Sequence, residues 1–310
     1  MFNRKKSESP GSLPSYDAEQ HLSTQQVHRA TRTRKIFSVL TAVFLFISVI
    51  FVIMVEVGQT YNRSVLRDIY FIKLDLSHII PAAVPNSVLI NSIARTLGLH
   101  DFYTVGLWGY CEGYNGDGVT NCSPPKTLYW FNPVEILQSE LLAGASINLP
   151  ADVNNILKLI HIVSNVMFGF YLAGACLSTV MIFIVPLSIY SRWASFAIAF
   201  FTFLAALFIT VGTVIATVMF IIFRNVIRGV AEINIQATIG INMFALMWVA
   251  AAFSIFAWLV QTGLCCCCAS RRDVKTGRKK GNKHAYTDTP AGETEKPKAR
   301  RRFRLGKKAS

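Results

Sequence analysis

Four long apolar runs of this chain carry no aspartate, glutamate, lysine or arginine in their middle parts. The runs are residues 36–57, 163–190, 193–223 and 239–264. Transporters, proton pumps and ion pathways are commonly marked by ionisable groups at membrane depth, so this absence argues against such a function. Glu56 and His161 stand only near the ends of runs.

The chain also lacks the sequence motifs of common enzymes. It has no phosphate-binding P-loop, no G-x-S-x-G motif of serine hydrolases and no H-E-x-x-H motif of zinc enzymes. Its histidines are scattered at His21, His28, His78, His100, His161 and His284. We therefore expect no catalytic activity, no cofactor and no metal site.

The chain does contain long hydrophobic segments. Hydrophobic residues make up 52% of its 310 residues and charged residues only 15%, which is more apolar surface than one soluble core could bury. Each run exceeds the roughly 20 residues that a helix needs to cross a bilayer. Only Ser191 and Arg192 separate the second run from the third, and Pro186 stands where a helix can end. We expect four spanning helices, the middle two joined as a tight hairpin.

The charged residues gather in the tails and predict the orientation. Residues 1–35 hold seven lysines and arginines against three acids, and residues 269–310 hold fifteen against four. The loop 56–160 holds six against nine. Lysine and arginine close to a membrane mark its cytosolic side. The residues that flank the runs in this way are Arg32, Arg34, Lys35, Arg271 and Arg272. Both termini are therefore predicted to be cytosolic.

The two predicted cytosolic tails, residues 1–35 and 265–310, have the polar and charged composition of disordered segments. They carry most of the net charge of +14. Because aromatic residues are scarce in them and no nucleic-acid-binding motif is present, we expect no nucleic-acid partner.

The predicted extracellular loop domain, residues 58–162, is too long for a simple connector and should fold by itself. Residues 71–77 alternate apolar and polar side chains, which predicts a strand with one buried face. Residues 103–110 and 128–131 predict two further strands. Residues 114–118 have the composition of a hairpin turn.

Two helical segments are predicted outside the spans. Residues 151–161 follow a proline and continue the helical pattern of the second span outward. The second predicted extracellular loop, residues 224–238, has spaced apolar residues, which indicate a helix lying on the outer interface.

Cys111 and Cys122 are the only cysteines of the long loop. A disulfide between them would stabilise the loop by about 3 kcal/mol. The alternative is a reactive redox pair, but nothing nearby lowers a thiol pKa. A disulfide persists only in an oxidising compartment, which agrees with a loop outside the cytosol.

Two asparagines, Asn62 and Asn121, stand in N-x-S sequons and are glycosylation candidates. Sequons also arise by chance. Asn62 follows the first span closely and Asn121 adjoins a cysteine, so an unmodified asparagine is the alternative at each site.

Four consecutive cysteines, Cys265, Cys266, Cys267 and Cys268, end the fourth span. Zinc sites usually space their ligands, so a contiguous run makes a poor metal cage. Cysteines beside a membrane are S-acylation sites. We interpret this cluster as a palmitoylation site, with idle thiols as the alternative.

A basic tail follows the cysteines at once, and it predicts contact with anionic lipids of the inner leaflet. An ordinary stop-transfer flank would explain its first arginines but not a second cluster thirty residues on. The candidate lipid-binding residues are Arg271, Arg272, Lys275, Arg278, Lys279, Lys280, Arg300, Arg301 and Arg302.

The loop residues resemble the fungal SUR/PalI family of claudin-like four-span membrane proteins. The resemblance rests on residues 69–79, 97–113, 122–123 and 130–133, and with the spans it covers about residues 36–264. The motif before the first cysteine reads Gly106, Leu107, Trp108, Gly109 and Tyr110. The wider claudin pattern has two tryptophans here, and this chain has only Trp108.

The resemblance implies an all-α membrane protein, a four-helix bundle capped outside by a small disulfide-stapled β-sheet. One branch of the family lies in static eisosome-type plasma-membrane domains beside BAR-domain scaffold proteins and supports cell-wall integrity. The PalI branch assists alkaline-pH signalling and has a longer cytosolic tail. The short tail here favours the eisosome-type function, with the signalling accessory as the alternative. Further partners that this reading implies are a second copy of the chain and cell-wall components.

Overall fold

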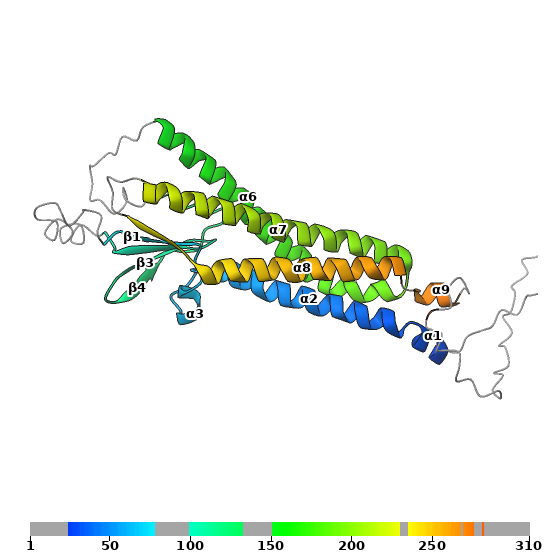
Figure 1. Cartoon of the computed structure of the whole chain (residues 1–310). Helices are drawn as coiled ribbons and strands as arrows, with labels where there is room; N and C mark the ends of the chain where they lie inside the picture. The colour runs from blue at the N-terminus through cyan, green and yellow to red at the C-terminus, as the bar shows by residue number, and fades with distance from the viewer. Residues whose placement is uncertain are drawn as a thin grey trace, which may run out of the picture.

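A computed structural model describes residues 24–77, 99–132, 151–229, 235–267, 269–275 and 281. Within these residues, four long helices form a bundle with a small sheet at one end (Figure 1). The long helices are α2 (Arg32–Val57), α6 (Ala151–Ile184), α7 (Arg192–Gly229) and α8 (Ile241–Cys267). Each of the four is long and apolar enough to cross a membrane, as the sequence predicts.

The two ends of the bundle differ. We call the end that carries the sheet the sheet end and the opposite end the tail end. At the tail end, the short helices α1 (Thr24–Ala30) and α9 (Arg271–Lys275) lie against each other and bury Val27, Ala30 and Val274 between them. The two described ends of the chain therefore leave the bundle on one side (Figure 1).

The turn between α6 and α7 is the predicted tight hairpin. A short 3₁₀ helix, η1 (Val185–Ile189), carries Pro186 in its first turn. Only Tyr190 and Ser191 then separate η1 from the first residue of α7. Proline is tolerated here because the first amides of a helix have no partner inside it.

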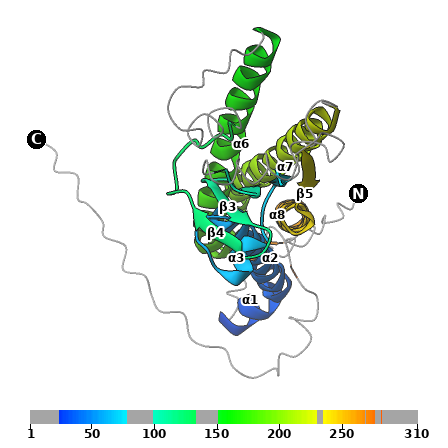
Figure 2. The same cartoon turned by 90° about the vertical axis from the view of Figure 1, so that its left-hand side faces the viewer.

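Helix α6 is much longer than a bilayer is thick. It begins at Ala151, so the predicted continuation of the helix over residues 151–161 is confirmed. Its 34 residues make about 51 Å at 1.5 Å per residue. Figure 2, which views the molecule from the sheet end, shows α6 and α7 extending beside the sheet.

The sheet has five antiparallel strands in the order β4-β3-β2-β1-β5. The strands are β1 (Ile72–Asp75), β2 (Phe102–Val105), β3 (Tyr110–Tyr114), β4 (Gly118–Cys122) and β5 (Gln236–Ile239). The predicted alternation in residues 71–77 is confirmed, because Ile72, Leu74 and Leu76 are all buried. The predicted hairpin turn also joins β3 to β4.

Two strand predictions for the long loop are wrong. Residues 103–110 do not form one strand, because the chain turns between β2 and β3. Residues 128–131 form no strand, since Leu128 adopts a positive φ of 55° and the aromatic rings turn to the helices instead. Trp130 packs on His161 of α6 and Phe131 on Phe223 of α7.

The predicted interfacial helix over residues 224–238 is also wrong. Helix α7 continues to Gly229, and residues 236–239 form β5. The strand pairs with β1, where Ala237 lies opposite Leu74 and is fully buried. This pairing satisfies the backbone groups along the open edge of β1, which a separate surface helix would leave without partners in the sheet.

One apolar core runs from the sheet into the bundle. The ring of Phe71, just before β1, stacks on Phe220 of α7 with centroids 4.6 Å apart. The same cluster of buried side chains contains Val52 of α2 and Met247 of α8. Sheet and bundle are therefore packed as a single unit.

Small residues let α6 and α7 approach closely, as is usual where helices pack in a membrane. A Cβ added at Gly174 would lie 2.7 Å from Cγ1 of Ile209. Gly212 packs against the ring of Tyr171. Gly169, in contrast, faces open space.

We predict that Gly174→Leu destabilises the bundle and that Gly169→Leu does not. Overpacking of this kind costs about 1–3 kcal/mol, so the midpoint of thermal unfolding of the purified protein in detergent should fall by several degrees. The matched Gly169→Leu variant on the same helix should shift the midpoint by about 1 °C or less, because its side chain meets no neighbour. Equal shifts for the two variants would contradict the α6–α7 interface.

Candidate functional sites at the two ends of the bundle

The predicted motif at the sheet end lies in the turn between β2 and β3, and it docks the sheet on the helices. A Cβ at Gly106 would lie 2.5 Å from the carbonyl oxygen of Gly58 and 2.7 Å from Cβ of Gln59. Only glycine allows this close approach of the turn to the end of α2. The motif is therefore explained by packing.

The aromatic residues of the motif reach the helices and the neighbouring strands. The ring of Trp108 meets the edge of Phe168 on α6 with centroids 4.8 Å apart. Leu107 is buried, and Tyr110 packs between Tyr103 and Tyr129. The motif thus joins the sheet to α6.

Cys111 and Cys122 form the predicted disulfide. They lie directly opposite each other on β3 and β4, so the bond closes the edge hairpin of the sheet. The Cys111 sulfur is buried, 3.4 Å from the carbonyl oxygen of Gln59. This placement in packed structure agrees with a structural bond.

Gln59 is a central residue at the sheet end that the sequence analysis missed. It is fully buried and has a positive φ of 61°. Its Nε2 donates hydrogen bonds to the carbonyls of Leu66 and Arg67, at 3.0 and 2.7 Å. Its Oε1 accepts from the Thr104 hydroxyl at 2.7 Å. One amide therefore ties the end of α2, the short helix α3 (Ser64–Arg67) and β2 together.

Both sequon asparagines lie exposed at the sheet end. Nδ2 of Asn62 donates to the carbonyl of Val119 at 2.9 Å, and Nδ2 of Asn121 donates to Glu112 Oε1 at 3.0 Å. Their glycosylation stays a prediction.

The cysteine cluster lies at the tail end, where α8 ends at Cys267. Cys268 lies outside the described residues. Cys265 is half-buried, and acylation of the cluster stays a prediction.

Only part of the predicted lipid-binding set falls within the described residues. Arg271, Arg272 and Lys275 form most of α9. The guanidinium of Arg271 lies 5.6 Å from the ring centroid of Tyr190. The remaining candidates, Arg278, Lys279, Lys280, Arg300, Arg301 and Arg302, lie outside the described residues.

Ser270 and Asp273 form a reciprocal cap at the start of α9. The Ser270 amide and hydroxyl donate to Oδ2 of Asp273 at 3.1 and 2.8 Å, and the Asp273 amide donates back to Ser270 Oγ at 3.1 Å. Nε of Arg192 lies 3.4 Å from the same carboxylate oxygen. Burial raises the pKa of Asp273, but the Ser270 hydrogen bonds and the charges of Arg192 and Arg34 outweigh it and hold this pKa below its usual value. The S-x-x-D spacing could have shown this cap in the sequence.

Arg34 has a structural role besides the one that the sequence analysis gave it, which was to mark the cytosolic side. It is almost fully buried, and its Nε and Nη2 donate to the carbonyl of Ser188 at 2.9 and 2.6 Å. It therefore fixes η1 to α2, in addition to adding positive charge. The sequence could have shown this role, because helical spacing places Arg34 on the same face of α2 as Ser38 and Thr41, which are buried.

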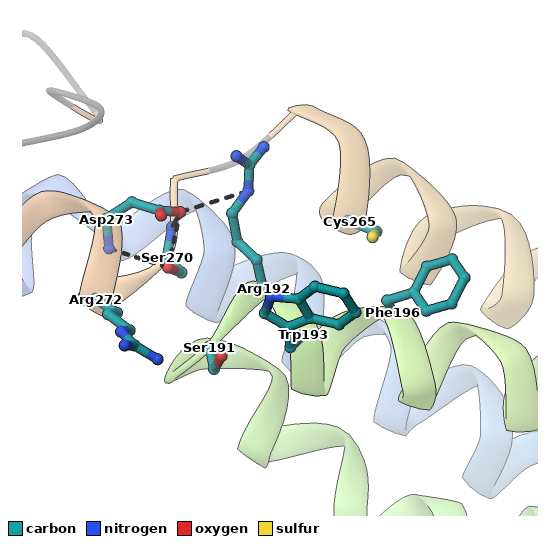
Figure 3. A pocket seen from close by; sticks show the side chains of 8 residues that line it. All are labelled: Ser191, Arg192, Trp193, Phe196, Cys265, Ser270, Arg272 and Asp273. Atoms are coloured by element: carbon teal, nitrogen blue, oxygen red, sulfur yellow. Dashed lines mark hydrogen bonds and ion pairs between the residues drawn. The ribbon is translucent and has the colours of Figure 1, made fainter.

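A cavity of about 770 Å³ opens at the tail end between the start of α7, the end of α8 and α9 (Figure 3). We call it the tail-end cavity. Its lining residues are Ser191, Arg192, Trp193, Phe196, Cys265, Ser270, Arg272 and Asp273. It thus brings one cysteine of the cluster and one arginine of the basic set together with two aromatic side chains. Sequence reasoning did not predict this meeting.

We predict that Cys111→Ser destabilises the sheet end by about 3 kcal/mol, because an unfolded loop without the bond gains conformational entropy. Limited proteolysis of the purified protein should then cut between residues 58 and 132 at protease concentrations that leave the wild type intact.

The matched control is Cys176→Ser, which removes an exposed free thiol on α6. It should leave the cleavage pattern unchanged. Wild-type resistance in the Cys111→Ser protein would contradict a stabilising role of the disulfide.

Comparisons with known proteins agree with this architecture. The sequence profile of the SUR7/PalI family matches residues 37–260. The SUR7 family protein pun1 of Schizosaccharomyces pombe is 24% identical over 267 residues, covering 73% of this chain and 93% of that protein. Protein PUN1 of Saccharomyces cerevisiae is 28% identical over 239 residues, covering 70% and 88%. The matched segment contains the sheet and all or most of each spanning helix, and this multi-pass membrane protein belongs to the SUR7/PalI family.

Proposed function

We propose that this protein is a non-enzymatic plasma-membrane protein that organises a static, eisosome-like membrane domain and supports membrane and cell-wall integrity. The observation that carries the proposal is the apolar core that runs unbroken from the sheet into the bundle. A folded head fixed rigidly to four spans can hold neighbouring molecules in one place, whereas a head on a loose tether cannot. Membership of a family of membrane proteins supports the same conclusion.

In this proposal the sheet end faces the cell exterior and both tails lie in the cytosol. The disulfide supports this orientation because such bonds persist in oxidising compartments. The lysines and arginines gathered beside the tail end support it too. The head would then meet cell-wall components or a second copy of the chain.

At the tail end the proposed partners are anionic lipids and, beyond them, BAR-domain scaffold proteins. Tyr190 and Trp193 are exposed where α6 and α7 meet, which is typical of aromatic residues at a membrane–water interface. Arg271 and Arg272 lie at the same level on α9. Acyl chains on the cysteine cluster would bias the protein towards ordered lipid regions.

The second candidate function is that of a PalI-like accessory protein in alkaline-pH signalling. Membership of the SUR7/PalI family supports this candidate as well, because the description of the family names PalI beside SUR7.

The test is live imaging of a C-terminal fluorescent fusion at endogenous level together with a labelled BAR-domain scaffold protein. We expect static cortical patches that coincide with the scaffold. As a control, growth of a strain without the gene should be normal at alkaline pH and impaired under cell-wall stress. A diffuse or endosomal signal, with growth lost at alkaline pH, would instead establish the signalling accessory.

A further inference from the structure

We propose that the tail-end cavity is a binding site for one anionic phospholipid. The phosphate would lie beside Arg192 and Arg272, and the first part of an acyl chain would lie against Trp193 and Phe196. This inference deepens the proposed function, on which it rests for placing the cavity at the inner leaflet. The predicted tail contacts are surface attraction, whereas this is a built site in the folded part of the chain.

The size and lining of the cavity fit an amphipathic ligand. Its volume of about 770 Å³ lies in the range of small-molecule binding sites. Ser191, Arg192, Ser270, Arg272 and Asp273 supply polar and charged groups. The other lining residues are two aromatic side chains and a cysteine. A purely polar ligand would leave that apolar part uncovered.

The cavity also lies at the depth of lipid headgroups. It is bounded by the first turn of α7 and the last turns of α8, where the apolar spans end. Trp193 is 83% exposed and Phe196 is 62% exposed, so both rings meet lipid in a membrane. Figure 3 shows these two side chains next to each other on α7, below the guanidinium group of Arg192.

The charges of the lining favour an anion. The lining contains two arginines and one carboxylate, that of Asp273. This carboxylate already accepts hydrogen bonds from Ser270 and lies 3.4 Å from Nε of Arg192. The lining therefore keeps a positive charge, and guanidinium groups match the oxygens of a phosphodiester in geometry as well as in charge.

The alternative occupant of the cavity is an acyl chain attached to Cys265. The Cys265 side chain lines the cavity, so an acyl chain on this cysteine could occupy the apolar part in place of a free lipid. A covalent chain would appear in the mass of the denatured protein, whereas a bound phospholipid would dissociate. The two occupants are therefore distinguished by one measurement.

The experiment is native mass spectrometry of the full-length protein released from nanodiscs that contain equal amounts of phosphatidylserine and phosphatidylcholine. We expect one phosphatidylserine retained per chain in preference to phosphatidylcholine. Arg272→Gln should lower the retained fraction roughly fivefold or more, the effect of one charge near an anionic lipid. Its matched control is Arg32→Gln, which removes the same charge from an exposed residue of α2 at the tail end, outside the lining, and should change retention less than about twofold.

A second pair of variants tests the apolar part without changing charge. Phe196→Trp fills the cavity and should reduce retention. Phe200→Trp, one turn further along α7 and outside the lining, should not. Glycerophosphoserine, the headgroup without chains, should not displace the lipid at equal concentration.

Several results would overturn the proposal. Equal losses in the two arginine variants would show surface attraction only. Unchanged retention in Arg272→Gln and Phe196→Trp, with loss on removal of residues 276–310, would assign the lipid to the tail. If every protein molecule carried the added mass of an acyl group on Cys265, the occupant of the cavity would be that acyl group and not a free phospholipid. None of these results depends on where the protein lies in the cell, so failure here is distinct from failure of the imaging test.

Discussion

The fold depends on β1, the strand that joins β2, β3 and β4 of the long loop to β5. This strand pairs with β2 on one side and with β5 on the other, although β5 comes from the far side of the second and third spans. Phe71, which begins the same segment, stacks on Phe220 of α7 and accepts a hydrogen bond from the Gly240 amide at 3.2 Å. Backbone pairing, ring stacking and the start of α8 therefore meet at one strand. A small sheet that lacks a large core of its own gains one from the bundle.

The spans are held together by packing and by hydroxyl groups. The hydroxyl of Ser48 donates to the carbonyl of Ala250 at 2.8 Å, and the hydroxyls of Tyr171 and Thr213 lie 3.0 Å apart. Among the described residues of the four spanning helices, the buried charge is that of Arg34 at the tail end, where it caps η1. This division suits the proposed function, because an apolar, closely packed bundle joins a rigid head to a charged, lipid-facing end.

The sequence predicts those parts of the structure that follow from local periodicity. Helix lengths, the hairpin at Pro186, the alternation around Leu74 and the pairing of the two loop cysteines all come from short stretches of residues. The strand at Gln236–Ile239 could not be predicted in this way, because its four residues form a strand only by pairing with a segment more than 160 residues earlier. The strand predicted over residues 128–131 is wrong for a related reason, because Trp130 and Phe131 pack their rings against helices outside the loop. The tail-end cavity is lined by residues of three separate segments, the starts of α7 and α9 and the end of α8. No single stretch of sequence could therefore predict it.

The most direct test of a single sheet-and-bundle unit is amide hydrogen exchange of the full-length protein in nanodiscs, with and without Phe220→Ala. Removing this buried ring costs about 3–5 kcal/mol. The account predicts that the amides of β1 and β5 lose protection together with those of α7, although Phe220 belongs to neither strand. The exposed Phe200→Ala should leave all three protected. Loss of protection in α7 with unchanged exchange in β1 and β5 would contradict the account, because the sheet would then be stable without the bundle.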